Sequence, residues 1–258
     1  MAGTSDGVGF TAIDDPLPPQ TLIETVGGGD FRAVGAEFLR IYTTVGGVDQ
    51  DAAVLDLGCG CGRMALPFTH FLTGGRYCGL DVNAEAIAWC RENIATRHPR
   101  FEFEYVDAHN SFYNPLGTVR AETYRFPYDN ASFDFVVASS LFTHLVWAET
   151  RNYVAETRRV LRSNGRALFT FFLLTPESEE LMASGRSRIL FPVEGDRCRV
   201  AIANDPARIV AYTEQDIRGL FAEGELEVRE IHAGRWPGRP SGLTMQDFVV
   251  AEPSANDV

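Results

Sequence analysis

Three glycines at alternate positions, Gly58, Gly60 and Gly62, follow a short apolar run that contains an acid, Asp56. Glycine adopts backbone dihedrals that a Cβ forbids, and it lets the chain approach a ligand closely. Because the glycines stand between an apolar run and a helix-compatible segment, the pattern predicts a strand, a tight turn and a helix. This is the first half of a nucleotide-binding βαβ unit, whose ligand would lie over the start of the helix near Gly62.

The spacing of the turn narrows the choice of nucleotide. A dinucleotide fingerprint that starts at Gly58 needs its third glycine at position 63, which is Arg63, so NAD is disfavoured. No Gly-Lys-Ser/Thr follows the turn, as a phosphate-binding P-loop requires. A glycine-rich turn can also be a tight connection that binds nothing, so the strands that follow have to distinguish these interpretations.

Two later strands are also expected to end in acids. Residues 76–81 end in Asp81, 19 residues past Gly62, and residues 101–107 end in Asp107. An acid at the first of these positions suits ribose hydroxyls, since an ionised carboxylate accepts two hydrogen bonds at once. Asp81 could instead only favour the N-terminus of the next helix. Together with the strand before the glycine turn, three successive strands thus end in carboxylates.

The stretch Val54-Leu-Asp-Leu-Gly-Cys-Gly-Cys-Gly62 resembles motif I of the class I S-adenosylmethionine-dependent methyltransferases. Residues 126–139, in which Ser132-Phe-Asp134 precedes an apolar run, resemble the fourth-strand motif of that family. The resemblance covers roughly residues 30–251. It implies an α/β fold with a doubly wound, seven-stranded, Rossmann-like sheet of strand order 3-2-1-4-5-7-6, in which strand 7 is antiparallel.

The resemblance also implies S-adenosyl-L-methionine as the cofactor and S-adenosyl-L-homocysteine as the product. Asp81 would bind ribose, while Asp107 and the backbone amide of Ala108 would meet the edge of adenine. The glycine turn would wrap the ribose and the amino-acid part. The full set of expected cofactor-binding residues is Asp56, Gly58, Cys59, Gly60, Gly62, Asp81, Val82, Asp107, Ala108 and Ser139.

Three histidines are candidates for catalysis. Methyl transfer from a sulfonium is an in-line displacement, and a hydroxyl acceptor must also lose its proton to a base. His144 follows the fourth strand, where the resemblance places the methyl group, and is the first candidate; it could equally be a buried hydrogen-bonding residue. His232 and His109 are the second candidates.

The acceptor is expected to contact Tyr113, Asn114, Arg235 and Trp236. Trp236 would offer a flat apolar surface to a sugar or another ring, although a rim tryptophan without a ligand fits the pattern as well. The segments 110–117, 140–145 and 232–236 also resemble, loosely, a bacterial subgroup that methylates small molecules or glycans. We therefore expect O-methylation of a saccharide or glycosylated metabolite. The alternatives are N- or C-methylation of another small metabolite, and a protein that binds S-adenosylmethionine without turnover.

The elements that position these residues are expected to form a single domain. Residues 1–29 are expected to be a flexible N-terminal arm, and residues 30–258 a class I methyltransferase domain. Two inserts, 110–125 and 175–212, leave the sheet at the carboxyl ends of strands and should hang over the site. The helix after the fourth strand is expected to end at Asn164-Gly165, since both residues tolerate left-handed dihedrals.

Composition excludes several classes of partner. The formal charge of −12 opposes binding to nucleic acid, which draws its affinity from clustered cations. Five cysteines form no even disulfide framework, and Cys59-x-Cys61 is a poor zinc site, so no metal site is expected, while assistance by a magnesium ion that binds the acceptor stays open. No signal peptide or run of 18 apolar residues occurs, so a cytoplasmic protein without a membrane partner is expected. The oligomeric state stays open.

Overall fold

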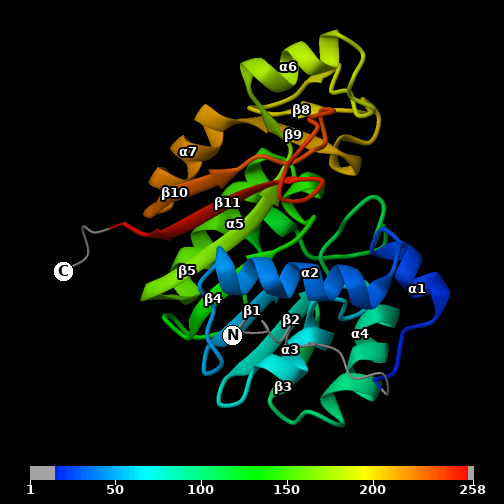
Figure 1. The fold of residues 1–258 in the computed structure, drawn as a ribbon, viewed down its shortest axis with the longest axis vertical. Helices are drawn as coiled ribbons and strands as arrows, with labels where there is room; N and C mark the ends of the chain where they lie inside the picture. The colour runs from blue at the N-terminus through cyan, green and yellow to red at the C-terminus, as the bar shows by residue number, and fades with distance from the viewer. Residues whose placement is uncertain (1–14, 255–258) are drawn as a thin grey trace, which may run out of the picture.

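The computed structural model describes residues 15–254, which form a sheet between two layers of helices with a smaller sheet at one end (Figure 1). The strands of the large sheet are β1 (Ala53–Leu57), β2 (Arg76–Asp81), β3 (Phe101–Tyr105), β4 (Phe133–Ala138), β5 (Leu161–Phe171), β10 (Leu226–His232) and β11 (Asp247–Pro253). Their order is β3-β2-β1-β4-β5-β11-β10, and β11 is antiparallel to both of its neighbours. The predicted strand order and the antiparallel last strand are therefore confirmed.

Helices cover both faces of this sheet. One face carries α2 (Phe31–Thr44), α3 (Ala65–Phe71) and α4 (Ala84–Cys90), which continues as the π-helix η1 (Arg91–Ala95); the other carries α5 (Trp147–Val160) and α7 (Glu214–Glu223). Strand β1 is buried along its whole length, as expected for a parallel strand covered on two faces. Its side chains alternate between two cores. Leu55 belongs to the core that includes α5 and α7, and Val54 to the core that includes α2 and α3.

The described part of the expected N-terminal arm contains the short helix α1 (Gln20–Thr25). Leu22 and Ile23 of this helix are buried in a small core that they share with Leu66 of α3. Residues 1–14 of the arm lie outside the described residues. We call residues 20–29 the N-terminal strap.

The two expected inserts differ in structure. Residues 110–125 contain one 3₁₀ turn, η2 (Ala121–Thr123), whereas residues 175–212 contain most of the smaller sheet. That sheet has the order β6-β9-β8-β7 and lies with α6 at one end of the molecule (Figure 1). The strands of this sheet are β6 (Leu173–Leu174), β7 (Val193–Glu194), β8 (Arg199–Val200) and β9 (Val210–Thr213). Helix α6 (Pro176–Ala183) lies between β6 and β7 in the sequence, and the 3₁₀ turn η4 (Pro206–Arg208) lies between β8 and β9.

Although far apart in the sequence, the two inserts contact each other. The Ser111 hydroxyl donates to the Asp205 carboxylate at 2.5 Å. The Arg208 guanidinium lies 3.4 Å from the centroid of the Phe112 ring, in a cation–π contact. These two contacts join the inserts above the carboxyl end of the sheet.

The expected end of the helix after β4 is wrong. Helix α5 ends at Val160, and Leu161 is already extended, with φ −78° and ψ 134°. Leu161 pairs with Phe133 of β4, and the pairing register then shifts before it continues further along β5. Asn164-Gly165 therefore lies in this irregular start of β5 rather than at the end of a helix.

Within residues 15–254, every helix is too short or too polar to span a lipid bilayer.

Candidate active site

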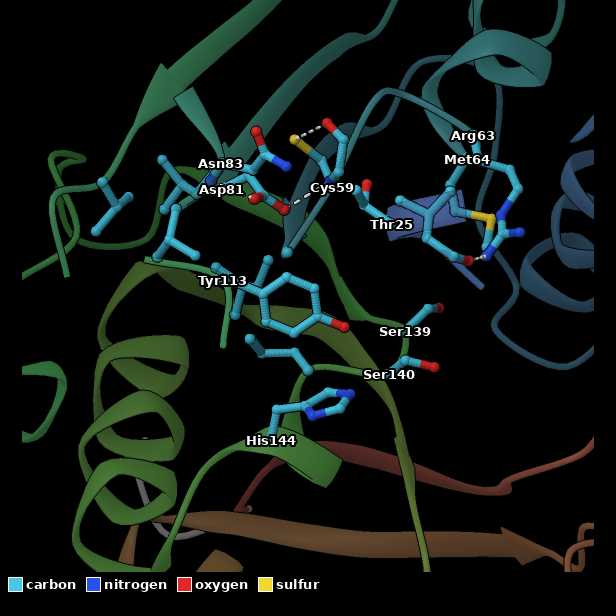
Figure 2. A pocket seen from close by; sticks show the side chains of 18 of the residues that line it. Thr25, Cys59, Arg63, Met64, Asp81, Asn83, Tyr113, Ser139, Ser140 and His144 are labelled. Atoms are coloured by element: carbon cyan, nitrogen blue, oxygen red, sulfur yellow. Dashed lines mark hydrogen bonds between the residues drawn. The ribbon is translucent and has the colours of Figure 1, made fainter. Parts of the chain in front are cut away.

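A cavity of about 230 Å³ lies at the carboxyl ends of β1, β2 and β4. Open α/β sheets bind their ligands at this edge. Figure 2 shows side chains from several separate segments around the cavity, with Tyr113 near its centre. The lining residues are Thr25, Val26, Gly27, Leu57, Gly58, Cys59, Gly60, Arg63, Met64, Leu80, Asp81, Val82, Asn83, Val106, Tyr113, Ser139, Ser140, Leu141, His144 and Tyr153.

The glycine turn forms one wall of this cavity. Gly58, Gly60 and Gly62 all have positive φ, at 78°, 53° and 79°, a region that side chains disfavour. A Cβ on Gly62 would lie 2.6 Å from the Ile94 side chain, and a Cβ on Gly60 would overlap Val26 of the strap. Gly62 thus permits close helix packing, while Gly60 permits the strap to lie directly on the turn.

Asp81 holds the turn and also faces the cavity. Its carboxylate accepts hydrogen bonds from the backbone N–H of Gly60 and from that of Asn83, both at 2.7 Å. Burial raises the pKa of Asp81, and these backbone hydrogen bonds oppose the rise. Each carboxylate oxygen has a second lone pair, so Asp81 can still accept hydrogen bonds from ligand hydroxyls.

Asp56 lies beneath the turn and does not line the cavity. It is 1% exposed and accepts a hydrogen bond from the Tyr77 hydroxyl. Burial raises the pKa of Asp56 to about 7, and the Tyr77 hydrogen bond opposes this shift. The structure therefore places Asp56 in the core, bonded to β2, and not in the cavity wall.

Asp107 and Ala108, expected at adenine, likewise lie outside the cavity lining, although Val106 beside them is part of it. The Asp107 carboxylate accepts from the Thr118 hydroxyl at 2.6 Å and from the Tyr105 hydroxyl at 2.9 Å. These hydrogen bonds lower the pKa of Asp107 to about 2. Ala108 is buried and forms a β-bridge with Val119. Both residues anchor the first insert to the end of β3.

His144 and Tyr113 face each other on the side of the cavity away from the glycine turn (Figure 2). His144 belongs to the 3₁₀ turn η3 (Phe142–His144), and its ring centroid lies 5.3 Å from that of Tyr113 in an edge-to-face contact. The Nδ1 atom of His144 is buried without a hydrogen-bond partner among the described residues. Burial lowers the pKa of His144, and the backbone of Ala207 and Arg208 opposes this effect. The imidazole is therefore neutral at pH 7.

The loop between β4 and η3 is held in place from three directions. The Ser139 hydroxyl lies 2.7 Å from the Tyr42 hydroxyl, and the Ser140 N–H donates to the Thr170 hydroxyl at 2.7 Å. The Ser140 hydroxyl donates to the Gln246 side chain at 3.0 Å. Ser140 has φ 62°, which is strained for a residue with a Cβ. These bonds fix the loop that carries His144.

The remaining candidate residues lie outside the cavity lining. His109 and Arg235 are exposed, and His232 pairs with Glu230 at 2.8 Å. The Asn114 amide donates to the Ala108 carbonyl at 3.1 Å and so holds the first insert. Trp236, expected beside the acceptor, is instead a core residue: it is 1% exposed, and its Nε1 donates to Asp247 at 2.6 Å.

Sequence reasoning missed several residues of the cavity. Thr25, Val26 and Gly27 belong to the strap, whose composition predicted no fixed structure. Arg63 was noticed only as the residue that replaces a third glycine. Its place directly after the turn was the one signal that could have assigned it to the site. No group of three or more His, Cys, Asp or Glu residues within 15–254 is arranged to hold a metal ion.

Comparison with known proteins identifies the fold family. Residues 55–169 match the family described as "Methyltransferase domain", and this segment includes the glycine turn, Asp81 and His144. This part of the chain is therefore similar to a methyltransferase domain. A crystal structure of the PH0226 protein from Pyrococcus horikoshii covers 89% of this chain and 93% of its own, with a TM-score of 0.61 and 17% identity. At that identity the likeness shows the fold alone.

Two curated relatives show more sequence identity over shorter segments. An uncharacterized methyltransferase from Arabidopsis thaliana is 29% identical over 55% of this chain and 37% of its own length. The phthiotriol/phenolphthiotriol dimycocerosates methyltransferase of Mycobacterium leprae is 32% identical over 45% of this chain and 36% of its own. The chain thus spans less than half the length of the curated relatives it matches.

Proposed function

We propose that this chain transfers a methyl group from S-adenosyl-L-methionine to a hydroxyl oxygen of a small molecule. The observation that carries the proposal is the presence, in one cavity, of the glycine turn, Asp81 and a neutral histidine whose Nδ1 has no partner among the described residues. The cofactor of the family supplies a methyl group activated on a positively charged sulfur. The chain itself must bind the cofactor, orient the acceptor and accept its proton.

The residues of the cavity fit such a cofactor. Gly58 lines the cavity with positive φ and no side chain, which suits close approach of a ligand. Asp81 offers carboxylate oxygens for ribose hydroxyls. Leu80, Val82 and Val106 add apolar lining suited to a flat base.

His144 is proposed as the general base. A neutral imidazole can take the proton of an acceptor hydroxyl as the new bond forms, and the lowered pKa of His144 keeps it neutral at pH 7. The edge-to-face contact with Tyr113 limits the orientations of the ring. His109 and His232 do not line the cavity, which favours His144 over both.

A saccharide or glycosylated metabolite is proposed as the first acceptor class to test. Tyr113, not Trp236, supplies the aromatic ring next to His144, and Leu141 and Tyr153 add further apolar surface. The relative from Mycobacterium leprae is named for phthiotriol, which supports a hydroxylated acceptor. The net charge of −12 supports a small molecule over nucleic acid.

Release of S-adenosylhomocysteine tests the proposal. We expect release from purified protein with at least one member of a panel of sugars, glycosides, phenols and polyols. His144→Ala should reduce it strongly, whereas the matched control His109→Ala, at an exposed position outside the cavity, should not. Methylation restricted to transfer RNA would contradict the acceptor class. Tight cofactor binding without turnover on any acceptor would indicate a binding protein instead.

A further inference from the structure

Arg208 of the second insert carries a positive charge that no carboxylate within residues 15–254 pairs with. Its guanidinium lies 3.4 Å from the centroid of the Phe112 ring, and none of its N–H groups is bonded to a described residue. The nearby carboxylate of Asp205 accepts from the Ser111 hydroxyl instead, at 2.5 Å. The chain has 35 acids and only 23 arginines, so this missing partner does not reflect a shortage of acids.

A series of ring contacts connects Arg208 to the proposed base. The ring centroids of Phe112 and Tyr113 lie 4.7 Å apart, and those of Tyr113 and His144 lie 5.3 Å apart. The turn η4, which ends at Arg208, also packs against η3, which ends at His144. Arg208 therefore adjoins the part of the cavity where Tyr113 and His144 face each other (Figure 2).

The charge of Arg208 acts on both of these cavity residues. Burial raises the pKa of Tyr113, Asp81 adds to the rise, and Arg208 opposes it. Burial lowers the pKa of His144, the backbone of Ala207 and Arg208 opposes this, and the charge of Arg208 lowers it further. The positive field of Arg208 thus extends to the groups that are proposed to meet the acceptor.

The contact with Phe112 holds the guanidinium without using its hydrogen bonds. A cation–π contact involves the face of the aromatic ring, so it leaves the five N–H donors of Arg208 for a ligand. The same contact limits the side-chain freedom that binding would otherwise remove. A guanidinium held in this way suits a carboxylate or a phosphate, each of which can accept two parallel hydrogen bonds from it.

Asp81 gives the cavity an opposite polarity at its other end. Figure 2 shows Asp81 and His144 on opposite sides of Tyr113. A negatively charged group on the acceptor is repelled by the carboxylate of Asp81 and attracted by Arg208. An anionic acceptor would therefore enter with its charged group on the side of His144, away from the ribose end.

We propose that the acceptor carries an anionic group, a carboxylate or a phosphate, which Arg208 binds while His144 faces the hydroxyl that is methylated. This inference rests on the proposed function, since it names the acceptor class of the same cavity. Arg208 takes no part in proton transfer. It binds a part of the acceptor that does not change during the reaction, so its loss should raise KM and leave kcat nearly unchanged.

The test uses pairs of acceptors that differ in the anionic group. Glucuronate and glucose differ in a carboxylate, glycerol phosphate and glycerol differ in a phosphate, and hydroxybenzoate and its methyl ester form an aromatic pair. Release of S-adenosylhomocysteine should show a lower KM for the anionic member of at least one pair. Arg208→Gln should raise that KM roughly 10- to 100-fold, as expected for loss of hydrogen bonds between charged groups. The KM of the neutral member should change by less than about threefold.

Three further variants separate the charge of Arg208 from its place in the fold. Arg208→Lys keeps the charge without the two parallel donors, so its KM should be intermediate. Arg208→Glu reverses the charge and should favour glucosamine over glucuronate. Arg188→Gln is the matched control, because Arg188 is an exposed arginine of the same insert outside the cavity lining, and it should change neither KM.

The outcomes distinguish this inference from the proposed function. A selective rise in the KM of anionic acceptors in Arg208→Gln supports the inference, and the pair that responds identifies the anion. If S-adenosylhomocysteine is released but the two members of each pair have the same KM, the inference is overturned and the proposed function stands. The same holds if Arg208→Gln lowers kcat equally for both members, since Arg208 then only supports His144. If no acceptor is methylated, the proposed function fails and the inference fails with it.

Discussion

Replacing Asp81 with alanine should weaken both the cofactor site and the fold, by amounts that can be separated. In the free protein its carboxylate accepts the N–H groups of Gly60 and Asn83 at 2.7 Å. Hydrogen bonds to charged groups contribute about 1.5–3 kcal/mol each, and partial exposure of Asp81 reduces this. We expect the free energy of unfolding to fall by roughly 1–3 kcal/mol. Two lost hydrogen bonds to ribose should remove about 3 kcal/mol of binding, or about a hundredfold in affinity.

Thermal unfolding and titration calorimetry with S-adenosylhomocysteine measure the two effects of this change. Asp81→Asn is the matched variant, because it keeps the shape and one acceptor oxygen but removes the charge, and its losses should be intermediate. NAD should bind neither the wild type nor the variants. Cofactor affinity that is unchanged in a folded Asp81→Ala protein would refute the ribose assignment.

Three other substitutions test other parts of the structure. His144→Ala should lower kcat by about 10²–10⁴ at nearly constant cofactor affinity. The wild-type rate should fall only below about pH 6.5, because His144 acts as a base in its neutral form and burial lowers its pKa. The same fall in rate at low pH in His144→Ala would contradict its role as the base. Gly60→Val should displace Val26 of the strap and weaken cofactor binding. If calorimetry shows the same cofactor affinity, and amide hydrogen exchange of residues 20–29 is also unchanged, Val26 does not lie on Gly60. Asp247→Ala should lower the urea-derived free energy of unfolding by about 3 kcal/mol through loss of Trp236 and backbone partners; a stable variant would disprove that support.

The large sheet could be predicted because its strands carry local signals. Apolar runs that end in Asp81 or in the glycine turn mark parallel strands, and the resemblance of these motifs to a known family supplied their order. The end of α5 could not be predicted, since Asn164-Gly165 has the composition of a helix end but lies in a strand. The competing factor is tertiary: Leu161 gains a pairing partner in Phe133 across the sheet.

Two of the predicted site residues, Asp81 and His144, line the cavity. Asp81 was predicted from its spacing to the glycine turn, since the ends of parallel strands meet at one edge, whereas His144 was predicted from the resemblance to the family. Trp236 could not be placed from its neighbours, because its position depends on Asp247, a buried carboxylate on β11. The strap was missed since the six residues of α1 are too few for a helix stable by itself. Its order depends on packing against α3 and on Arg63.

The residues lining the cavity, within the described chain, all lie between Thr25 and Tyr153. The second insert lines no part of the cavity but contacts residues that do or that adjoin them: the backbone of Ala207 and Arg208 lies against His144, and Arg208 stacks on Phe112 beside Tyr113. In the proposed enzyme, substitutions in residues 175–212 therefore alter the surroundings of His144 and of the first insert while leaving the residues that line the cavity unchanged. Acceptor preference is then an evolvable property that is separate from cofactor affinity. Exchanging residues 175–212 between homologues should therefore change the acceptor specificity without changing the cofactor affinity.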